Sequence, residues 1–214
     1  MKIQVFPVNE LQVNCYLLWD ETSFEAALID CGAQSPAEWA EIKEQIIERQ
    51  LTLKYVLLTH CHFDHIMGLA YIHRDFGKAP IFHHFDQQVY DKMPQMATQF
   101  GIALPLPLPQ AESHLKGGEE LPLGESILKV LHTPGHTWGG VCFYAPKEQF
   151  VISGDTLFRG SLGRTDLGGD MDEEIHSIRT KLLTLPPETN VYPGHGPAST
   201  IGWEQQNNPY VRSY

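Results

Sequence analysis

Four residues that can bind a metal ion are crowded into six consecutive positions of the chain. The stretch LTHCHFDHIMG contains His60, His62, Asp64 and His65, and His60 directly follows the apolar run YVLLT. A strand is stiff and the turn after it bends, so a rigid scaffold can present ligands at such a junction. Imidazole and carboxylate groups suit Zn²⁺, Fe or Mn better than soft metals. The cluster therefore predicts a metal site.

Three later positions have a similar setting, because each lies in a glycine- or proline-flanked loop after an expected strand. They are His136 in HTPGHTWGG, Asp155 in ISGDTLF and His195 in YPGHGPA. Together with the first cluster they make seven candidate ligands. One tetrahedral zinc ion needs only four ligands, solvent included. Seven ligands are the number expected for two divalent metal ions that share a bridging carboxylate.

The other histidines lack this context, and we interpret them as surface or packing residues: His73, His83, His84, His114, His132 and His176. His132 comes nearest to the pattern, but the PGH that follows it is the better ligand site. Cys61 lies between two candidate ligands and is expected to point the other way, into the core.

Short strands and helices are expected to position these residues. Apolar and β-branched runs predict strands at IQVF, NCYLLW, AALID, YVLLT, APIFHH, SILKVLHT, GVCFYA, QFVISGD and NVY. A helix is expected near AEWAEIKEQIIERQ, with Ser35 as its cap and Pro36 in its first turn. Its side chains at helical spacing should face the core, namely Trp39, Ile42, Ile46 and Ile47. Further helices are expected at 66–76, with Asp64 and His65 at its N-terminus, and at 85–99 and 172–184.

The strands come in two batches with intervening helices, which predicts an α/β protein made of two packed sheets with helices outside. A doubly wound sheet fits less well, because hairpin-like strand runs occur at both ends of the chain. A length of 214 residues, with 42% apolar and 19% charged residues, fits one domain over 1–214. The proline-rich stretch 103–109 should be an irregular surface connection near the active site.

Charge and composition disfavour several classes of partner. The net charge of −11 would repel nucleic acid, and no basic run offsets it. The N-terminus lacks the pattern of a signal peptide, and no apolar run approaches the roughly 20 residues that span a bilayer. Four widely spaced cysteines indicate reduced thiols in a cytoplasmic protein. Nothing in the sequence specifies an oligomeric state.

The motifs THCHFDH, PGHT, GDTLF and PGHG, in this order, resemble the metallo-β-lactamase fold superfamily over about residues 10–200. The resemblance implies an αββα sandwich of two mixed sheets flanked by helices. It also implies a first metal bound by His60, His62 and His136, and a second bound by Asp64, His65 and His195. Asp155 would bridge the two ions, most simply zinc, with iron or manganese as alternatives.

Within the superfamily, the pattern is similar to the short, bacterial, glyoxalase II-like (hydroxyacylglutathione hydrolase-like) branch. Many true β-lactamases have a cysteine ligand and lack the histidine that follows the motif aspartate, whereas His65 is present here. The resemblance implies hydrolysis of a small-molecule thioester such as a hydroxyacylglutathione. Metal ions lower the pKa of water, so a hydroxide that bridges them would attack the carbonyl. Asp64 would orient this hydroxide.

The substrate carrier is a separate question from the reaction. Typical glyoxalase II enzymes hold glutathione with a C-terminal helical domain, for which this chain is expected to be too short. Arg164, in GSLGRTDL, could meet a substrate carboxylate, or could fix its loop through a buried salt bridge to Asp166 or Asp170.

Two other functions remain as alternatives. A persulfide dioxygenase of the same superfamily would hold one iron through positions matching His60, His136 and Asp155, and its GRTD loop resembles residues 163–166. A non-catalytic metal-binding or scaffold protein is disfavoured, because a structural zinc site needs only four ligands. A nucleic-acid hydrolase is the least favoured, because of the net charge.

Overall fold

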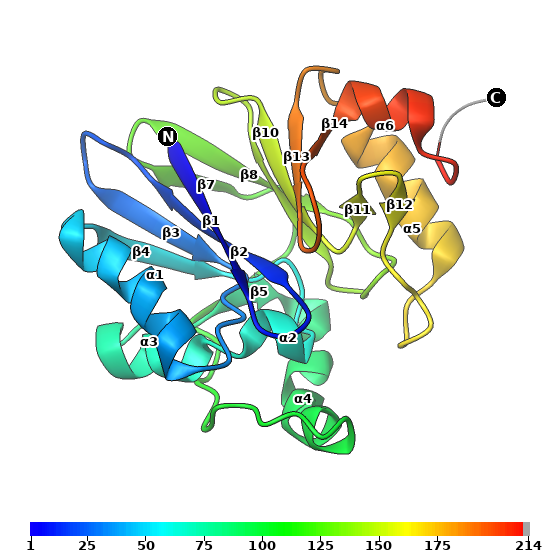
Figure 1. Cartoon of the computed structure of the whole chain (residues 1–214). Helices are drawn as coiled ribbons and strands as arrows, with labels where there is room; N and C mark the ends of the chain where they lie inside the picture. Colours follow the sequence, from blue (N-terminus) through cyan, green and yellow to red (C-terminus); the bar gives the residue numbers. More distant parts are fainter. Residues whose placement is uncertain (212–214) are drawn as a thin grey trace.

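The computed structural model describes residues 1–211, and its strands form two large mixed sheets packed face to face (Figure 1). The first sheet has the strand order β1 (Lys2–Val8), β2 (Val13–Trp19), β3 (Glu25–Ile29), β4 (Thr52–Leu57), β5 (Ile81–His83), β6 (Ser113–Leu115). The second has the order β14 (Ser199–Thr200), β13 (Asn190–Pro193), β10 (Phe150–Gly154), β9 (Val141–Ala145), β8 (Ser126–His132), β7 (Glu120–Leu123). A small hairpin joins β11 (Leu157–Phe158) and β12 (Ser161–Leu162).

Each large sheet contains both strand directions. In the first sheet β1, β2 and β3 pair antiparallel, and β3 to β6 pair parallel. In the second sheet β7 to β10 pair antiparallel, β13 runs parallel to β10, and β14 is antiparallel to β13. The parallel strands are connected through helices, as the geometry of a parallel pair requires.

Helices cover the outer faces of both sheets (Figure 1). They are α1 (Pro36–Glu48), α2 (Phe63–Ile66), α3 (Leu69–Phe76), α4 (Gln87–Gln99), α5 (Met171–Ser177) and α6 (Ile201–Asn207). A 3₁₀ turn, η1 (His84–Asp86), leads into α4, and a π-helical stretch, η2 (Ile178–Leu182), follows α5. The fold is thus the expected αββα sandwich, and the doubly wound alternative is wrong.

Alternating side chains create the layers. Successive residues of a strand point to opposite faces, so a strand buried on both sides contributes to two cores. In β2, Cys15 and Leu17 pack toward the helices, whereas Tyr16 and Leu18 pack between the sheets. The same alternation in the second sheet places Ile152 between the sheets and Val151 under the helices on the far side. Three apolar layers therefore separate four layers of backbone.

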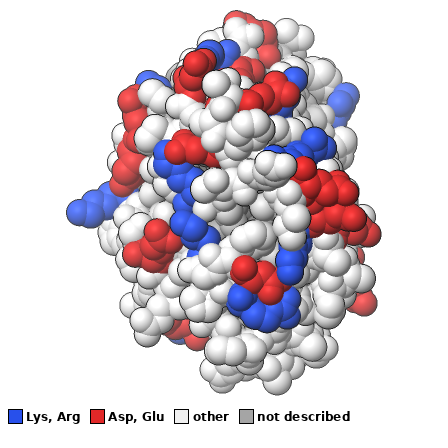
Figure 2. Space-filling model, turned by 90° about the vertical axis from the view of Figure 1, so that its left-hand side faces the viewer, with Lys and Arg blue, Asp and Glu red and all other residues white. Residues whose placement is uncertain are grey.

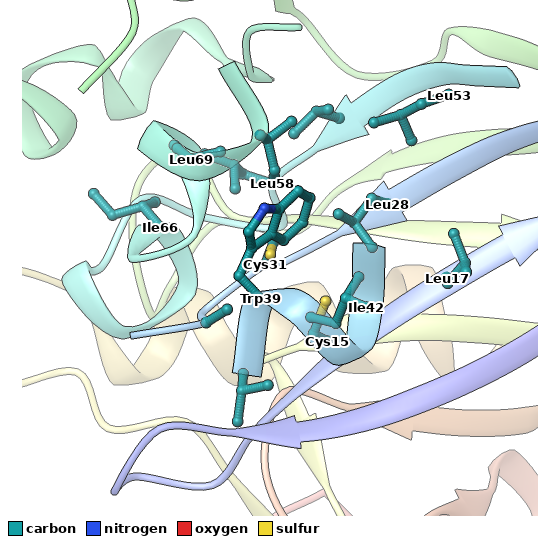
Figure 3. Packing of buried hydrophobic residues seen from close by; sticks show 14 of the residues in the cluster. Cys15, Leu17, Leu28, Cys31, Trp39, Ile42, Leu53, Leu58, Ile66 and Leu69 are labelled. Carbon is teal, nitrogen blue, oxygen red and sulfur yellow. The ribbon is translucent and has the colours of Figure 1, made fainter. Parts of the chain in front are cut away.

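The helix-side core of the first sheet shows how the local sequence forms this packing (Figure 3). Trp39 from α1 lies among Leu28, Cys31 and Leu58, all of them buried. Its indole nitrogen donates a hydrogen bond of 2.8 Å to Asp75 Oδ2 of α3, which satisfies the polar end of a largely apolar side chain. The two helices are thereby held together on the outer face of the sheet.

Helix α1 begins and ends close to the expected positions. Ser35 caps it by accepting from the Glu38 amide, Glu38 in turn accepts from the Ser35 amide, and Pro36 is the first helical residue. The expectation that Ile47 faces the core is wrong, because its side chain is 57% exposed. Residue 47 lies about 100° around the helix from its buried neighbour at 46, which takes it off the buried stripe.

The single helix expected at 66–76 is also wrong, because α2 and α3 are separate helices. A continuous helix would bond the Gly68 amide to the Asp64 carbonyl. Instead that carbonyl accepts from Asn9 Nδ2 at 3.0 Å, and the Gly68 amide donates to the Cys31 carbonyl at 2.7 Å. Asp64 and His65 consequently lie inside the short helix α2 rather than at the start of a long one.

The other expected strands and helices occur, with small shifts at their ends. The helix expected at 85–99 is η1 followed by α4, and the one expected at 172–184 is α5 followed by η2. Six elements were not predicted, namely β6, β7, β11, β12, β14 and α6. Within the described part of the chain, no helix has both the length and the apolar character needed to cross a membrane. All four cysteines are buried and unpaired, and Cys61 packs in the core as expected.

Candidate metal centre

The seven candidate ligands lie at the ends of strands from both sheets. His60 follows β4 by a short turn, and His62, Asp64 and His65 belong to α2 or its cap. The loop from β8 to β9 carries His136, the residue after β10 is Asp155, and His195 follows β13. The edge at which these loops meet is where a two-sheet scaffold can bring distant residues together.

Three histidines form the first group. The ligand atoms of His60, His62 and His136 all lie within 4.8 Å of one another. His136 Nε2 is 2.9 Å from His62 Nδ1 and 3.2 Å from His60 Nε2. Zinc–nitrogen bonds of 2.0–2.1 Å at tetrahedral angles would separate neighbouring nitrogens by roughly 3.3 Å. The spacing of the three rings is therefore close to that of a metal site.

Asp64, His65 and His195 form the second group, which meets the same 4.8 Å limit. His195 Nε2 lies 3.3 Å from Asp64 Oδ2, and His65 Nε2 lies 3.7 Å from the same oxygen.

Asp155 lies between the two groups. Its Oδ1 is 3.3 Å from His65 Nε2. Its Oδ2 is 3.5 Å from His195 Nε2 and 3.7 Å from His136 Nε2. One carboxylate thus faces histidines of both groups, which is the arrangement that a bridging ligand requires.

Side chains behind the rings orient His60, which follows β4, and His65 of α2. His60 Nδ1 donates to Thr59 Oγ1 at 3.1 Å, because that hydroxyl uses its own proton on Asp30 Oδ2 at 2.7 Å. Asp30 Oδ2 also lies 3.2 Å from His65 Nδ1, and Asp30 Oδ1 accepts from the Thr59 amide. Buried Asp30 therefore orients one histidine of each group, as carboxylates commonly do behind ligand histidines.

Backbone carbonyls orient the histidines of the later loops, His136 and His195. His136 Nδ1 donates to the Arg164 carbonyl at 2.6 Å, and His195 Nδ1 donates to the Leu11 carbonyl at 2.9 Å. The His136 amide donates to Glu174 Oε2 from α5. In the neutral form of each ring the bond to the carbonyl places the proton on Nδ1, so that Nε2, which is directed into the cluster, is free to bind a metal.

A second buried carboxylate joins the two loops that carry the first group. Asp86, at the start of α4, accepts from the Cys61 amide at 3.0 Å, between His60 and His62. It also accepts from Thr137 Oγ1 at 3.0 Å and from the Gly139 amide at 2.8 Å, just after His136.

The His195 loop is held by a strand of the opposite sheet. The Asn14 amide donates to the Gly194 carbonyl at 2.7 Å, and Tyr16 Oη donates to the Pro193 carbonyl at 2.7 Å. A Cβ at position 194 would lie 2.1 Å from Asp155 Oδ1, so only glycine allows the loop to pass so close to that carboxylate. The glycine before His195 in the PGHG motif therefore lets the backbone lie against the Asp155 carboxylate.

The electrostatics of the cluster favour a bound cation. Burial, together with the neighbouring His65, lowers the pKa of His60 well below its usual value, and burial and His136 lower that of His62 to about 4. Burial alone would raise the pKa of Asp155, but His65 and His136 hold it below its usual range. His60 and His62 are therefore kept neutral beside an ionised Asp155. Burial also lowers the pKa of His65 and His195, but Asp64 and Asp155 outweigh it and raise both. A bound cation would take the place of those protons, since metal ligands must be deprotonated.

These residues fit one or more metal ions on their own geometry. His60 Nε2 and His136 Nε2 point unprotonated nitrogens at each other, which is unfavourable unless a cation lies between them. Among the described residues, His65 Nε2 and Asp155 Oδ1 are buried without a hydrogen-bond partner. Buried polar atoms are seldom left unpaired, and metal coordination would satisfy both.

A cavity of about 490 Å³ opens beside the cluster. Its lining includes ligand residues of both groups, together with a wall of apolar side chains. Arg164 also lines it, but its guanidinium is paired with Asp166 in two hydrogen bonds of 2.7 Å. Both partners are largely exposed, so the pair is a surface salt bridge and not the buried one considered from the sequence.

A family model described as the metallo-β-lactamase superfamily matches residues 8–195. The chain belongs to the metallo-β-lactamase superfamily. The matched region contains all seven candidate ligands, so the family assignment covers the whole site.

Individual members of the superfamily are similar over their full length. Hydroxyacylglutathione hydrolase GloC from Haemophilus influenzae is 36% identical, with 100% of this chain and 99% of that protein covered. The crystal structure of TTHA1623 in a di-iron-bound form has a TM-score of 0.85 at 38% identity, covering 97% of this chain and 100% of that one. The crystal structure of the B3 metallo-β-lactamase BLEG-1 has a TM-score of 0.87 at 33% identity, covering 99% of this chain and 100% of that one.

The seven candidate ligands lie together as the sequence predicts, but the residues behind them were not predicted. None of the six other histidines joins a ligand group within residues 1–211; His132, the nearest to the pattern, stacks on His83 with ring centroids 4.0 Å apart. Asp30 had a detectable signal, because it follows an apolar strand and precedes Cys31-Gly32. Asp86 and Glu174 had none, since their contacts with the site depend on the folded chain.

Proposed function

We propose that this protein is a metal-dependent hydrolase that cleaves a small-molecule thioester with two divalent metal ions. The observation that carries the proposal is the position of Asp155, whose two oxygens face histidines of both groups. The likeness to hydroxyacylglutathione hydrolase GloC supports the thioester class. We also propose that residues 1–214 act as one metallo-β-lactamase-like domain.

The proposed ligands bind the two ions in the two groups described above. His60, His62 and His136 would hold one ion, Asp64, His65 and His195 the other, and Asp155 both. Nitrogen and carboxylate ligands suit zinc, which we propose, and they also suit iron and manganese. The di-iron-bound form of TTHA1623, at 38% identity, keeps iron as a candidate.

Divalent ions in such a site lower the pKa of water and polarise a carbonyl oxygen. The residues of the chain perform the remaining tasks. Burial raises the pKa of Asp64, but His65 and His195 outweigh that effect and keep the carboxylate ionised. Asp64 lines the cavity, so it can orient an attacking water and accept its proton. A departing thiolate needs no acid, because a free thiol has a pKa of about 8.5.

The charge of the chain bears on the class of partner. A net charge of −11 disfavours a polyanionic substrate, and we propose neither a nucleic acid nor a membrane as partner. On the face shown in Figure 2, Lys and Arg side chains are intermingled with Asp and Glu. A small molecule that enters the cavity beside the ligands is therefore the proposed substrate.

Two other activities on the same scaffold can be separated by one experiment. The purified protein is analysed for metal content, then assayed for thiol release from lactoylglutathione, oxygen uptake with a persulfide, and opening of a β-lactam ring. We expect about two metal ions per chain and thiol release. His136→Ala should lower the metal content and abolish thiol release, whereas His73→Ala, which alters an exposed histidine, should change neither. Oxygen uptake with one iron per chain would indicate the persulfide dioxygenase instead. Ring opening without thiol release would indicate a β-lactamase such as BLEG-1.

A further inference from the structure

The cavity beside the ligand cluster has one predominantly apolar wall. Six apolar side chains line it, and they come from α2, α4, the hairpin β11–β12 and the loops around them: Leu11, Phe63, Met96, Phe158, Leu162 and Leu167. The ligand residues His62, Asp64, His136, Asp155 and His195 line the same cavity. An apolar surface and the proposed reacting centre thus share one space of about 490 Å³, which is within the range of small-molecule sites.

The cavity has few basic side chains that could bind an anionic substrate carrier. Within the described chain, Arg164 is the only lysine or arginine among the lining residues. Its Nε donates to Asp166 Oδ1 and its Nη2 to Asp166 Oδ2, both at 2.7 Å, a bidentate pair that uses one edge of the planar guanidinium. A carrier with two carboxylates, such as glutathione, would find no unpaired basic side chain there.

We infer that the cavity binds an uncharged, apolar chain of the thioester, on one side of the bond that is cleaved. This inference rests on the proposed thioester hydrolysis and names the substrate class that the cavity favours. Burial of a methylene group is worth about 0.8 kcal/mol, or about fourfold in binding. Substrate selectivity should therefore grow with chain length until the wall is covered.

Two matched series of thioesters test the inference and show which side of the bond carries the chain. In the first, the thiol is N-acetylcysteamine, which is uncharged, and the acyl group runs from acetyl to octanoyl. In the second, the acyl group is acetyl and the thiol is an alkanethiol of increasing length. In one of the series kcat/KM should rise by about two- to fourfold for each added methylene. Lactoyl-N-acetylcysteamine should be hydrolysed at least as efficiently as lactoylglutathione.

Two leucine variants assign the effect to this cavity. Leu167 is 39% exposed and Leu106 is 59% exposed, so neither substitution removes a buried core side chain. Leu167→Ser should reduce the ratio of kcat/KM between the longest and shortest substrates by about threefold or more. Leu106→Ser, at a residue that does not line this cavity, should leave that ratio as in the parent.

The outcomes separate the inference from the proposed function. The inference would be overturned if kcat/KM stayed constant or fell with chain length in both series, or if the protein strongly preferred lactoylglutathione. Either result would leave the proposed thioester hydrolysis unaffected. If no thioester is hydrolysed, the proposed function fails, and the cavity is then tested by binding. In that case hexanethiol should raise the melting temperature of the metal-loaded protein more than ethanethiol does. Equal effects of the two thiols would overturn the inference by itself.

Discussion

The Asp86 carboxylate accepts a hydrogen bond of 3.0 Å from the backbone amide of Cys61. Cys61 stands between two proposed ligands of one loop, and the other contacts of Asp86 are to the loop that carries His136. One buried carboxylate therefore sets the spacing of the three histidines of the first group. It touches none of the proposed ligand side chains.

Asp86→Ala should weaken metal binding by about 10- to 100-fold, which is typical when a group behind metal ligands is removed. It should also destabilise the protein, because each buried donor left unpaired costs about 1–3 kcal/mol. Metal affinity is measured by competition with a chelator. Asp86→Asn, which keeps one acceptor oxygen, should recover part of the affinity, and Asp91→Asn on the exposed side of α4 should match the parent. Full affinity in Asp86→Ala would remove the positioning role.

Asp155→Ala should lower the number of bound metal ions as well as turnover, because both groups lose a shared ligand. Metal analysis of the purified variant measures the loss, and Asp172→Ala, at an exposed aspartate, is the control. An Asp155→Ala protein with its full complement of metal but no activity would make Asp155 a catalytic group only.

The seven proposed ligand positions could be predicted because each belongs to a short motif directly after a strand. The layers could be predicted as well, since the strands come in two batches with intervening helices. Asp86 could not be predicted, because its partners lie 25 and 53 residues away along the chain. The break between α2 and α3 was missed because it depends on Asn9 capturing the Asp64 carbonyl. The two-residue strands β11, β12 and β14 are too short to give a periodic pattern.

Glu174→Gln should make the stability of the protein less dependent on pH. Burial raises the pKa of Glu174 from 4.5 to about 9, so the folded state retains a proton that the unfolded state has lost. The contribution of Glu174 to stability is then greatest below about pH 4.5 and declines as pH rises toward 9. Glutamine can still accept from the His136 amide but does not ionise.

Urea unfolding of the metal-free protein at several pH values measures this effect. The stability of Glu174→Gln relative to the parent should increase steadily between about pH 4.5 and 9. Glu173→Gln, at the neighbouring position of α5, should give curves parallel to those of the parent. Parallel curves for Glu174→Gln would show that this carboxyl is not held protonated.

Arg164→Ala tests the role of the basic residue at the cavity. If Arg164 fixes its loop through Asp166, KM for lactoylglutathione should stay within about twofold of the parent, and Asp166→Asn should behave alike. An exposed ion pair of this kind contributes little to stability, so folding should hardly change. A raised KM at unchanged kcat, in Arg164→Ala alone, would instead support a clamp on a substrate carboxylate.

The dependence of thioester hydrolysis on bound metal tests the central proposal most directly. The protein is stripped with a chelator and titrated with zinc, and thiol release is followed together with the number of ions bound per chain. We expect no hydrolysis without metal and full hydrolysis only when both the first group and the group around Asp64 are filled, near two ions per chain. Full thioester hydrolysis by the stripped protein, or its absence from the fully loaded one, would contradict the proposal.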